Sequence, residues 1–508
     1  MHKRLIIILS ISIALLITTG CTNTINEFTK LEKLPRIFPD YSSLVIPSNI
    51  APLNFNINEE GSEYQVEIYS KSGTKISIRQ KSSKIIIPID KWHKLLDMNK
   101  GNSLTIDVYA KQDKWYKYAA ITDTIASETI DTHLVFRLIG MVYTYFNKMG
   151  IYQQNLENFD KSVIYENTSN EKKTCVNCHS FSHNNPGKMS LHVRTTDAGT
   201  VIFDEGKLKK YNTKTKYTMS PAAYTAWHPN GELIAYSVNK LIVNFTSYAS
   251  KIVEVWDKAS DLIVFNVKTN TITTSPKIST QSRENLPNWS PDGKWLYFIS
   301  APEANKDGSN WIQVKYDLLR IAFDPEKMTW GEVDTLLTSK QTGMSITFPI
   351  ASPDGRYILF CMIDHSYFSI FDKSSDLYLL DLKTKQYRKL DILNSLVTES
   401  YHSWSKNGRW IVFSSKRING LCTQPYFAYF DKQGQFHKPF VLPQEDPLFY
   451  QTDNWNFNLP VLVDGKVEIS ANEFRDFIDE KPQDARFDES VDVDALSGGT
   501  WLEKEKNK

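Results

Sequence analysis

The sequence predicts a mainly β protein, with a small N-terminal β-sandwich of immunoglobulin or fibronectin type and a C-terminal β-propeller of about six blades. Two observations predict this fold. A unit of an apolar strand, a tight turn closed by glycine and a second apolar strand recurs four times after residue 195. Short segments within 46–130 alternate polar and apolar residues with a period of two, which is typical of half-buried strands. The 508 residues are too many for one core, so we expect several domains.

The N-terminus reads as an export signal. Lys3 and Arg4 precede a short apolar run at 5–17 that is too short to span a bilayer. The small residues that end in Gly20, directly before Cys21, resemble a bacterial lipobox. That resemblance implies cleavage before Cys21 and lipidation of its thiol, whereas ordinary signal cleavage nearby is the alternative.

Six parts are expected along the chain. In order they are a signal peptide at 1–20, a tether at 21–45, a β-sandwich at 46–130, a helical connector at 131–194, a β-propeller at 195–474 and a mobile tail at 475–508. The connector is predicted to be helical because apolar residues between His133 and Phe159 recur near helical spacing. The tail shows no periodicity and ends in a lysine-rich stretch.

The repeated unit predicts the blades. Its four copies span 226–236, 288–298, 350–360 and 403–413. An Asp or Asn before the glycine supplies a turn residue that tolerates a positive φ. Four-strand repeats of about 50–60 residues are typical of propeller blades.

This unit resembles the WD40-like repeat, W-S-P-D-G-K-x-I-x-F, of TolB-like periplasmic proteins. The resemblance covers roughly 190–470 and departs from the pattern at His228 and at Lys406-Asn407. It is specific for the fold and weak for function, because propellers host many activities.

One stretch of the sequence has the pattern of a cofactor-attachment site, and it is Cys175-Val176-Asn177-Cys178-His179. It reads C-x-x-C-H, the attachment signature of a c-type haem. Two thiols two residues apart match the two vinyl groups of the porphyrin, and the following His179 can be the proximal ligand of the iron. The sequence therefore predicts one covalent haem bound by Cys175, Cys178 and His179.

Three other interpretations of this stretch stay open. A zinc site could use Cys175, Cys178, His183 and His192, which are permissible ligand types. A dithiol redox pair could use the C-x-x-C spacing, although no thioredoxin-like unit surrounds it. A structural disulfide is the third, since the chain is expected to be exported.

The sixth ligand of the iron is predicted to be Met189, because a thioether raises the reduction potential, as suits a one-electron carrier. His192 is the second candidate, and Met189 could instead be core packing. His183 is four residues beyond His179 and is expected to be too close to reach the opposite face. An open sixth site would favour small-molecule binding. His228 and Tyr401-His402 are weaker candidates for lining one rim of the propeller.

The layout also resembles a group of Gram-negative lipoproteins that carry a C-x-N-C-H-S-F segment, here 175–181, followed by N-P-x-x-M-x-x-H, here 185–192. The resemblance implies a single covalent haem and names no substrate. We expect an envelope-anchored, monohaem cytochrome-like lipoprotein that transfers one electron or interacts with an envelope protein in a redox-linked way. The propeller is then the docking platform. The alternatives are a non-redox TolB-like scaffold with a structural haem or none, and a haem enzyme or sensor with an open axial site.

The composition and motifs of the chain argue against several classes of partner and activity. The net charge of +1 gives no electrostatic reason to expect nucleic acid. No G-x-S-x-G, phosphate-binding loop or H-E-x-x-H occurs, so a hydrolase would rest on fold analogy alone. Cys361 and Cys422 are expected to be packed or free thiols. The expected location is the Gram-negative envelope, lipid-anchored through Cys21, with the periplasmic face of the outer membrane favoured.

Overall fold

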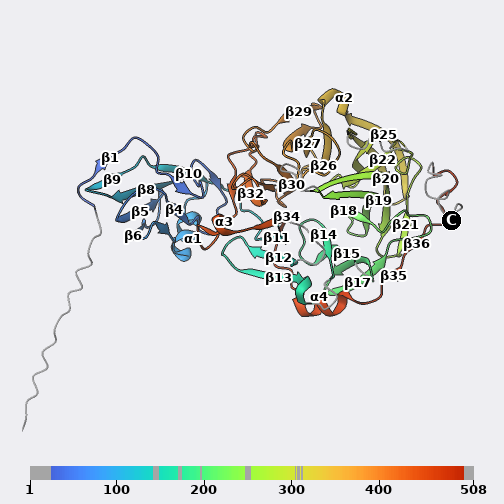
Figure 1. Ribbon diagram of the computed structural model, residues 1–508, viewed down its shortest axis with the longest axis horizontal. Coiled ribbons are helices and arrows are strands. Elements are labelled where there is room, and N and C mark those ends of the chain that lie inside the picture. The colour runs from blue at the N-terminus through green and yellow to red at the C-terminus, as the bar shows by residue number, and fades with distance from the viewer. Residues whose placement is uncertain are drawn as a thin grey trace, which may run out of the picture.

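The computed structural model describes residues 25–140, 148–169, 174–194, 197–245, 253–303, 305, 309 and 313–496. The predicted signal peptide and Cys21 lie outside these residues. The described chain is mainly β, and it forms an N-terminal domain beside a larger ring of sheets (Figure 1). Within the described residues, no helix is long and apolar enough to cross a membrane.

The N-terminal domain contains a seven-stranded and a three-stranded sheet. The larger has the order β1-β9-β8-β10-β3, with β5 paired to β8 and β6 to β5, and the smaller has the order β2-β4-β7. Their strands are β1 (Thr29–Lys30), β2 (Ile37–Phe38), β3 (Val45–Ile46), β4 (Phe55–Ile57), β5 (Glu63–Tyr69), β6 (Ile76–Gln80), β7 (Lys84–Ile85), β8 (Ser103–Lys111), β9 (Trp115–Lys117) and β10 (Ile121–Ile125). The alternation in β5 and β8 is the pattern that predicted strands here, and an immunoglobulin-type sandwich remains a prediction.

Two features of this domain differ from the prediction. The helix α1 (Ile89–Asp97) follows Pro88 and buries Trp92 in the core. The segment expected to be a tether begins β1 at Thr29, so most of 21–45 belongs to the domain. Two-residue strands pair through the backbone and leave no periodic sequence pattern, which is why the sequence did not reveal them.

Six further sheets form the ring. The strands of the first sheet, in the order β13-β12-β11-β34, are β11 (His133–Gly140), β12 (Met149–Asn155), β13 (Lys161–Glu166) and β34 (Trp455–Val463). Those of the second are β14 (Val176–Phe181), β15 (Lys188–Val193), β16 (Gly199–Asp204), β17 (Lys207–Asn212) and β35 (Gln483–Asp484). Those of the third are β18 (Ala223–Trp227), β19 (Leu233–Phe245), β20 (Val253–Asn266), β21 (Thr271–Thr273) and β36 (Arg486–Phe487).

The last three sheets are four-stranded meanders in chain order. The strands of the fourth are β22 (Arg283–Trp289), β23 (Trp295–Ala301), β24 (Asp317–Asp324) and β25 (Thr329–Leu337). Those of the fifth are β26 (Ser345–Ala351), β27 (Tyr357–Ile363), β28 (Asp376–Asp381) and β29 (Gln386–Lys389). Those of the sixth are β30 (Glu399–Trp404), β31 (Trp410–Ser415), β32 (Gln424–Tyr429) and β33 (Phe440–Val441). The short helices are η1 (Asn167–Ser169), α2 (Ser339–Thr342), α3 (Phe449–Thr452) and α4 (Ala471–Ile478).

The ring is closed by pairing of strands that are far apart in the sequence. The innermost strand of the first sheet is β34, which pairs antiparallel with β11 from His133↔Val463 to Gly140↔Trp455. The innermost strands then follow one another in space as β34, β14, β18, β22, β26 and β30, and β30 lies beside β34 again. This arrangement is a β-propeller, in which antiparallel meanders surround an axis.

The prediction of a helix between His133 and Phe159 is wrong, because the described residues of this segment form β11 and β12. Residues 134–139 are all buried, since β11 has neighbours on both faces of its sheet. A strand buried on both faces loses the alternation of polar and apolar residues, and its apolar run then resembles a helix. Part of the predicted apolar stripe, at 141–147, lies outside the described residues.

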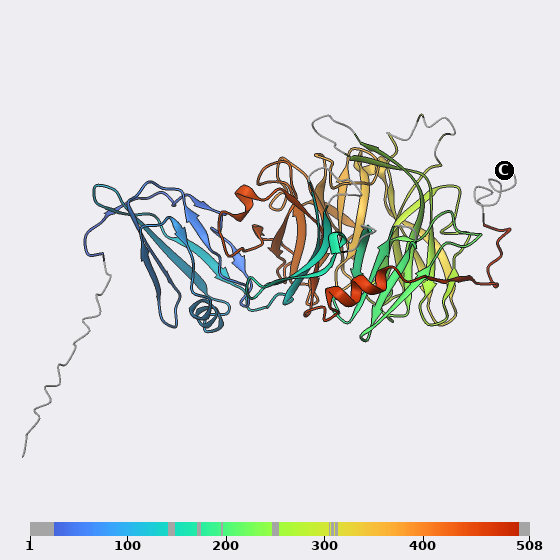
Figure 2. The ribbon, with the colours of Figure 1, turned by 60° about the horizontal axis from the view of Figure 1, so that its bottom comes forward.

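The tail at 475–508 also differs from its prediction, as far as the structure describes it. Residues to Ile478 complete α4, and β35 and β36 then add parallel to β17 and β21 at the outer edges of two sheets. Figure 2 shows this segment running along the side of the ring. These edge strands pair through backbone groups, so a charged, aperiodic sequence can form them.

The turns of the repeats form as expected, with one difference. Gly293 and Gly355, like the equivalent glycines of the other two copies, have a positive φ near 70°. The preceding Asp292 does not; instead its carboxylate accepts hydrogen bonds from the Ser290 hydroxyl at 2.6 Å and the Lys294 N–H at 3.1 Å. His228 replaces this serine and accepts the Asn230 N–H at 3.1 Å, so it is a turn residue.

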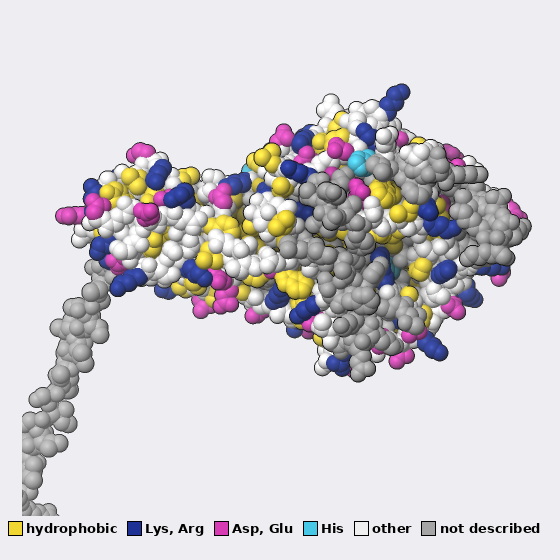
Figure 3. Space-filling view, in the orientation of Figure 1, with side chains coloured by type: hydrophobic (Ala, Val, Ile, Leu, Met, Phe, Trp, Pro, Cys, Tyr) yellow, Lys and Arg dark blue, Asp and Glu magenta, His cyan; other side chains and the backbone are white. Residues whose placement is uncertain are grey.

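The N-terminal domain contacts the sixth sheet and the segment after it. Lys438 pairs with Asp40 at 2.7 Å, and Lys84 pairs with Asp446 at 2.9 Å. Buried residues of both domains belong to one hydrophobic cluster. On the visible surface, basic and acidic side chains are interspersed, in keeping with the small net charge (Figure 3).

Candidate functional site

A cavity of about 420 Å³ is lined by residues of all six innermost strands. It therefore lies where the sheets converge on the axis of the ring. Ligand sites in proteins are commonly concave, mostly apolar and supplied with a few convergent polar groups. Its lining is largely apolar, and Arg137 and Arg194 contribute to it, whereas no Asp or Glu does among the described residues.

Each innermost strand carries a β-bulge at this cavity. A shift in pairing register occurs in all six, and one residue at each shift has a positive φ between 29° and 54°. We call these six residues the collar: Cys178, Tyr224, Leu286, Phe348, Tyr401 and Leu459. Bulges re-aim side chains and are common beside functional sites. All six collar residues line the cavity.

The collar has a signal in the sequence that the repeat pattern alone does not reveal. In the four repeats, the collar residue stands three positions before the residue that leads into the turn, as Tyr401 does before Trp404. Tyr224 has the same spacing from Trp227. The rim position predicted for Tyr401-His402 thus becomes a position on the axial cavity.

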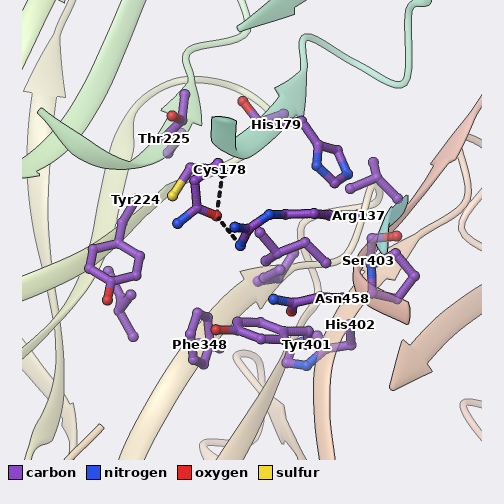
Figure 4. Close-up of a pocket in the computed structure, with 18 of the residues that line it drawn as sticks. Arg137, Cys178, His179, Tyr224, Thr225, Phe348, Tyr401, His402, Ser403 and Asn458 are labelled. Carbon is purple, nitrogen blue, oxygen red and sulfur yellow. Dashed lines mark hydrogen bonds between the residues drawn. The ribbon is translucent and has the colours of Figure 1, made fainter. Parts of the chain in front are cut away.

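The C-x-x-C-H stretch coincides with this feature. Cys178 is the collar residue of β14, and His179 follows it; both line the cavity (Figure 4). The motif therefore lies on a bulged strand and not in the helical connector that we expected at 131–194. Cys178 carries a free thiol, so no disulfide joins it to Cys175.

His179 is buried, at 3 % exposure, and neither of its ring nitrogens makes a hydrogen bond of ordinary geometry. Burial lowers its pKa to about 4, although the backbone at Val135 and Leu459 opposes the shift. The ring is therefore neutral at neutral pH, and one of its two nitrogens carries a lone pair. A buried polar group without a protein partner needs an explanation, and a bound group would supply one.

Hydrogen bonds fix the backbone around Cys178. Asn177 Oδ1 accepts the Cys178 N–H at 2.8 Å and an N–H of Arg137 at 3.1 Å (Figure 4). The Arg137 guanidinium also lies 3.9 Å from Cys175 Sγ and 3.5 Å from Met149 Sδ. Arg137 thus contacts one thiol of the motif and the residue that precedes the other.

Cys175 differs from Cys178 in its surroundings. It is buried with Ile139 and Met149 in a small separate cluster, and it is not among the residues that line the cavity. Ile139 belongs to both, so this cluster borders the cavity. Cys178 and His179 lie at the cavity, as a covalently attached haem requires, whereas the Cys175 thiol would have to turn toward the axis to form the second link.

The two predicted sixth ligands lie outside the cavity lining. Met189 is buried, at 1 % exposure, in the core between the first two sheets, with Val135 and Leu191 among its neighbours. The His192 ring is held by the Thr200 hydroxyl at 3.0 Å and packs on Tyr236 at 5.6 Å. Both sit on β15, one strand away from the axis.

Of the other histidines, His183 and His402 line the cavity. Both nitrogens of His402 are engaged, with Nε2 2.9 Å from the Leu359 carbonyl oxygen and Nδ1 3.8 Å from Cys361 Sγ. His183 is exposed, on the turn after β14. The predicted zinc set is not assembled, because no three His, Cys, Asp or Glu side chains of the described chain could share a metal ion.

Comparisons with known proteins find only distant likenesses. No family model and no curated protein matches the chain. The solved structures that resemble it include a TolB-like protein from Agrobacterium tumefaciens, at 14% identity and a TM-score of 0.36, covering 62% of this chain and 89% of that one. The β-propeller domain of the Trilobed protease from Pyrococcus furiosus has 12% identity and a TM-score of 0.33, covering 68% and 83%. Likenesses this distant carry no argument about the fold, a cofactor or a substrate.

Proposed function

We propose that this protein is a lipid-anchored propeller of a Gram-negative envelope, whose six sheets are the blades and whose axial cavity holds one covalently attached haem c. Cys175 and Cys178 would form the thioether links, and His179 would be the axial imidazole. The observation that carries the proposal is His179, which is buried at the cavity beside Cys178 and whose ring nitrogens make no hydrogen bond of ordinary geometry. The bound group would supply one-electron chemistry.

Two further features support this proposal. Arg137 and Arg194 line the cavity, and no described lining residue is acidic, which favours a ligand with carboxylates such as the two propionates. The collar is mostly apolar or aromatic, with Phe348 and Tyr401 in edge-to-face contact at 4.7 Å. A largely apolar lining that includes two cationic groups suits a large planar molecule with two anionic groups at its edge.

The test is covalent haem in protein expressed with a haem-attachment system. The wild type is expected to keep its haem after denaturation, whereas Cys178→Ala loses one thioether link and Cys175→Ala loses the other. Cys361→Ala is the matched control, because that buried thiol lies in the fifth sheet and should not affect attachment. A wild type without covalent haem contradicts the proposal.

A non-redox propeller scaffold is the second candidate. It is favoured by Cys175, whose side chain packs with Ile139 and Met149 outside the cavity lining. In that case the cavity would bind a ligand directly, and mass spectrometry would find both thiols unmodified. If haem is present, voltammetry decides whether one-electron transfer to an envelope partner is feasible at physiological potentials.

A further inference from the structure

The chain enters the N-terminal domain at the end of that domain which lies farthest from the ring. β1 pairs in parallel with β9, so Phe28 lies level with Trp115, beside the turn between β8 and β9. Figure 1 shows β1 and β9 at this end of the molecule. Cys21, the predicted point of lipid attachment, precedes Ile25, the first described residue, by four residues, which span at most about 14 Å of extended chain. A lipid on Cys21 would therefore keep this end of the domain close to a bilayer.

Aromatic and cationic side chains gather on one face of the larger sheet at this end. Lys111 pairs directly opposite Trp115, and its ammonium lies 5.9 Å from the centroid of the half-buried Trp115 ring. The Arg79 guanidinium lies 5.1 Å from the same ring. Beside them, the half-buried Phe28 ring contacts the Tyr109 ring edge-to-face at 5.6 Å. Indole and phenol rings flanked by lysine and arginine are enriched at the headgroup level of membranes, because they combine an apolar body with a polar tip.

The turn between β8 and β9 is polar. Its residues at 112–114 are exposed, and the Asp113 carboxylate accepts the Tyr116 hydroxyl at 3.1 Å. On the neighbouring sheet face, the Glu63 carboxylate pairs with Arg79 at 2.7 Å, so its charge is compensated. This end of the domain therefore suits the depth of lipid headgroups and water, and not the hydrocarbon core.

We propose that this end of the domain, formed by Phe28, Trp115 and their flanking cationic side chains, contacts the headgroups of the bilayer that holds the lipid of Cys21. The inference rests on the lipid anchor of the proposed function and not on the haem. A bilayer is favoured over a glycan or a protein partner, because the short link from Cys21 places the bilayer beside this face. The N-terminal domain would then separate the propeller from the bilayer, since the ring lies on the other side of the domain (Figure 1).

The test measures whether Trp115 reaches the bilayer. The full-length, acylated protein is inserted into vesicles of phosphatidylethanolamine and phosphatidylglycerol with added phosphatidylcholine, which is either brominated near the headgroup or unbrominated. Bromine quenches tryptophan fluorescence on contact, so the difference between the two vesicles reports rings that lie at the bilayer. We compare the wild type with Trp115→Phe. Trp295→Phe is the matched control, because Trp295 is also half-buried and lies 4.1 Å from an arginine, Arg320, but belongs to β23 of the ring.

We expect the brominated lipid to quench part of the wild-type emission. Trp115→Phe should lose most of this quenching, and Trp295→Phe should keep it. An acylated wild type without quenching overturns the inference, as does a Trp115→Phe variant that is quenched as strongly as the wild type.

A response of Trp115 to soluble peptidoglycan fragments in place of the bilayer also overturns the inference, because the face then binds a glycan. These results leave the lipid anchor standing. Mass spectrometry of the N-terminal peptide separates them from failure of the anchor, since a chain without acyl groups on Cys21 overturns the anchor and this inference together.

Discussion

Met189 lies in the core between two sheets. Its position in the fold therefore favours a packing role over the role of iron ligand that the sequence analysis predicted. Its thioether would raise the reduction potential of a bound iron, so the sequence analysis favoured it as a ligand. In β15 the side chain opposes Phe181 and packs in the core with Leu191, away from the cavity lining. Strand alternation decides this direction, and it becomes readable only once β15 is known to be a strand.

We predict that Met189→Ala destabilises the protein by about 2–5 kcal/mol, because it opens a void in a packed core. The absorption spectrum of the haem protein should stay unchanged, since the thioether is not at the axis. Thermal unfolding and an oxidised-state spectrum measure the two effects. Met189→Leu keeps the volume and should cost less than about 1.5 kcal/mol. If Met189→Ala instead loses a far-red band at normal stability, the thioether is a ligand after all.

Among the elements, the sequence predicted the hairpins whose turns have a recognisable side-chain pattern. The four glycine-closed turns predicted the hairpins between the two inner strands of the last four sheets, and these form. The strands β11 and β12 could not be recognised, because burial on both faces removes alternation. The sequence did not predict the bulges either. They depend on how six strands converge at the axis, and the sequence of a single repeat does not contain that information. For the site, the sequence selected Cys178 and His179 but not Arg137, whose role depends on the pairing of β11 with β34.

A buried lysine holds the chain just before β35 and β36, and this gives a second prediction. Lys210 Nζ donates to the carbonyl oxygens of Ile478 at 2.7 Å and Glu480 at 2.9 Å, at the C-terminal end of α4. Lys210→Met should lower the free energy of unfolding by about 1–3 kcal/mol, because buried carbonyls lose their donor. Hydrogen exchange should rise at 483–487. Lys209→Met, at the neighbouring exposed position, is the control, and equal effects in both variants would contradict this role for Lys210.

At the scale of the whole molecule, ring closure joins segments hundreds of residues apart. Asp131, just before β11, accepts the Lys406 N–H at 3.0 Å and the Asn184 side-chain N–H at 3.2 Å. Asn184 also donates to the Leu462 carbonyl oxygen at 2.7 Å, on β34. These contacts connect the first, second and sixth sheets on one side of the ring.

The buried carboxylate of Asp131 at this ring closure predicts that the stability of the protein depends on pH. Burial raises the pKa of Asp131 to about 6; the Lys406 N–H opposes the shift and the nearby Asp464 adds to it. The folded state therefore binds this proton more tightly than the unfolded state does, so Asp131 makes the protein less stable as the pH rises from about 4 to about 6. The loss should be on the order of 2 kcal/mol. Urea unfolding of the wild type and Asp131→Asn across this range should show the loss in the wild type alone, because the amide does not titrate. Parallel pH profiles would mean that Asp131 is ionised in the folded state throughout, and that its two N–H donors outweigh the cost of burying the charge.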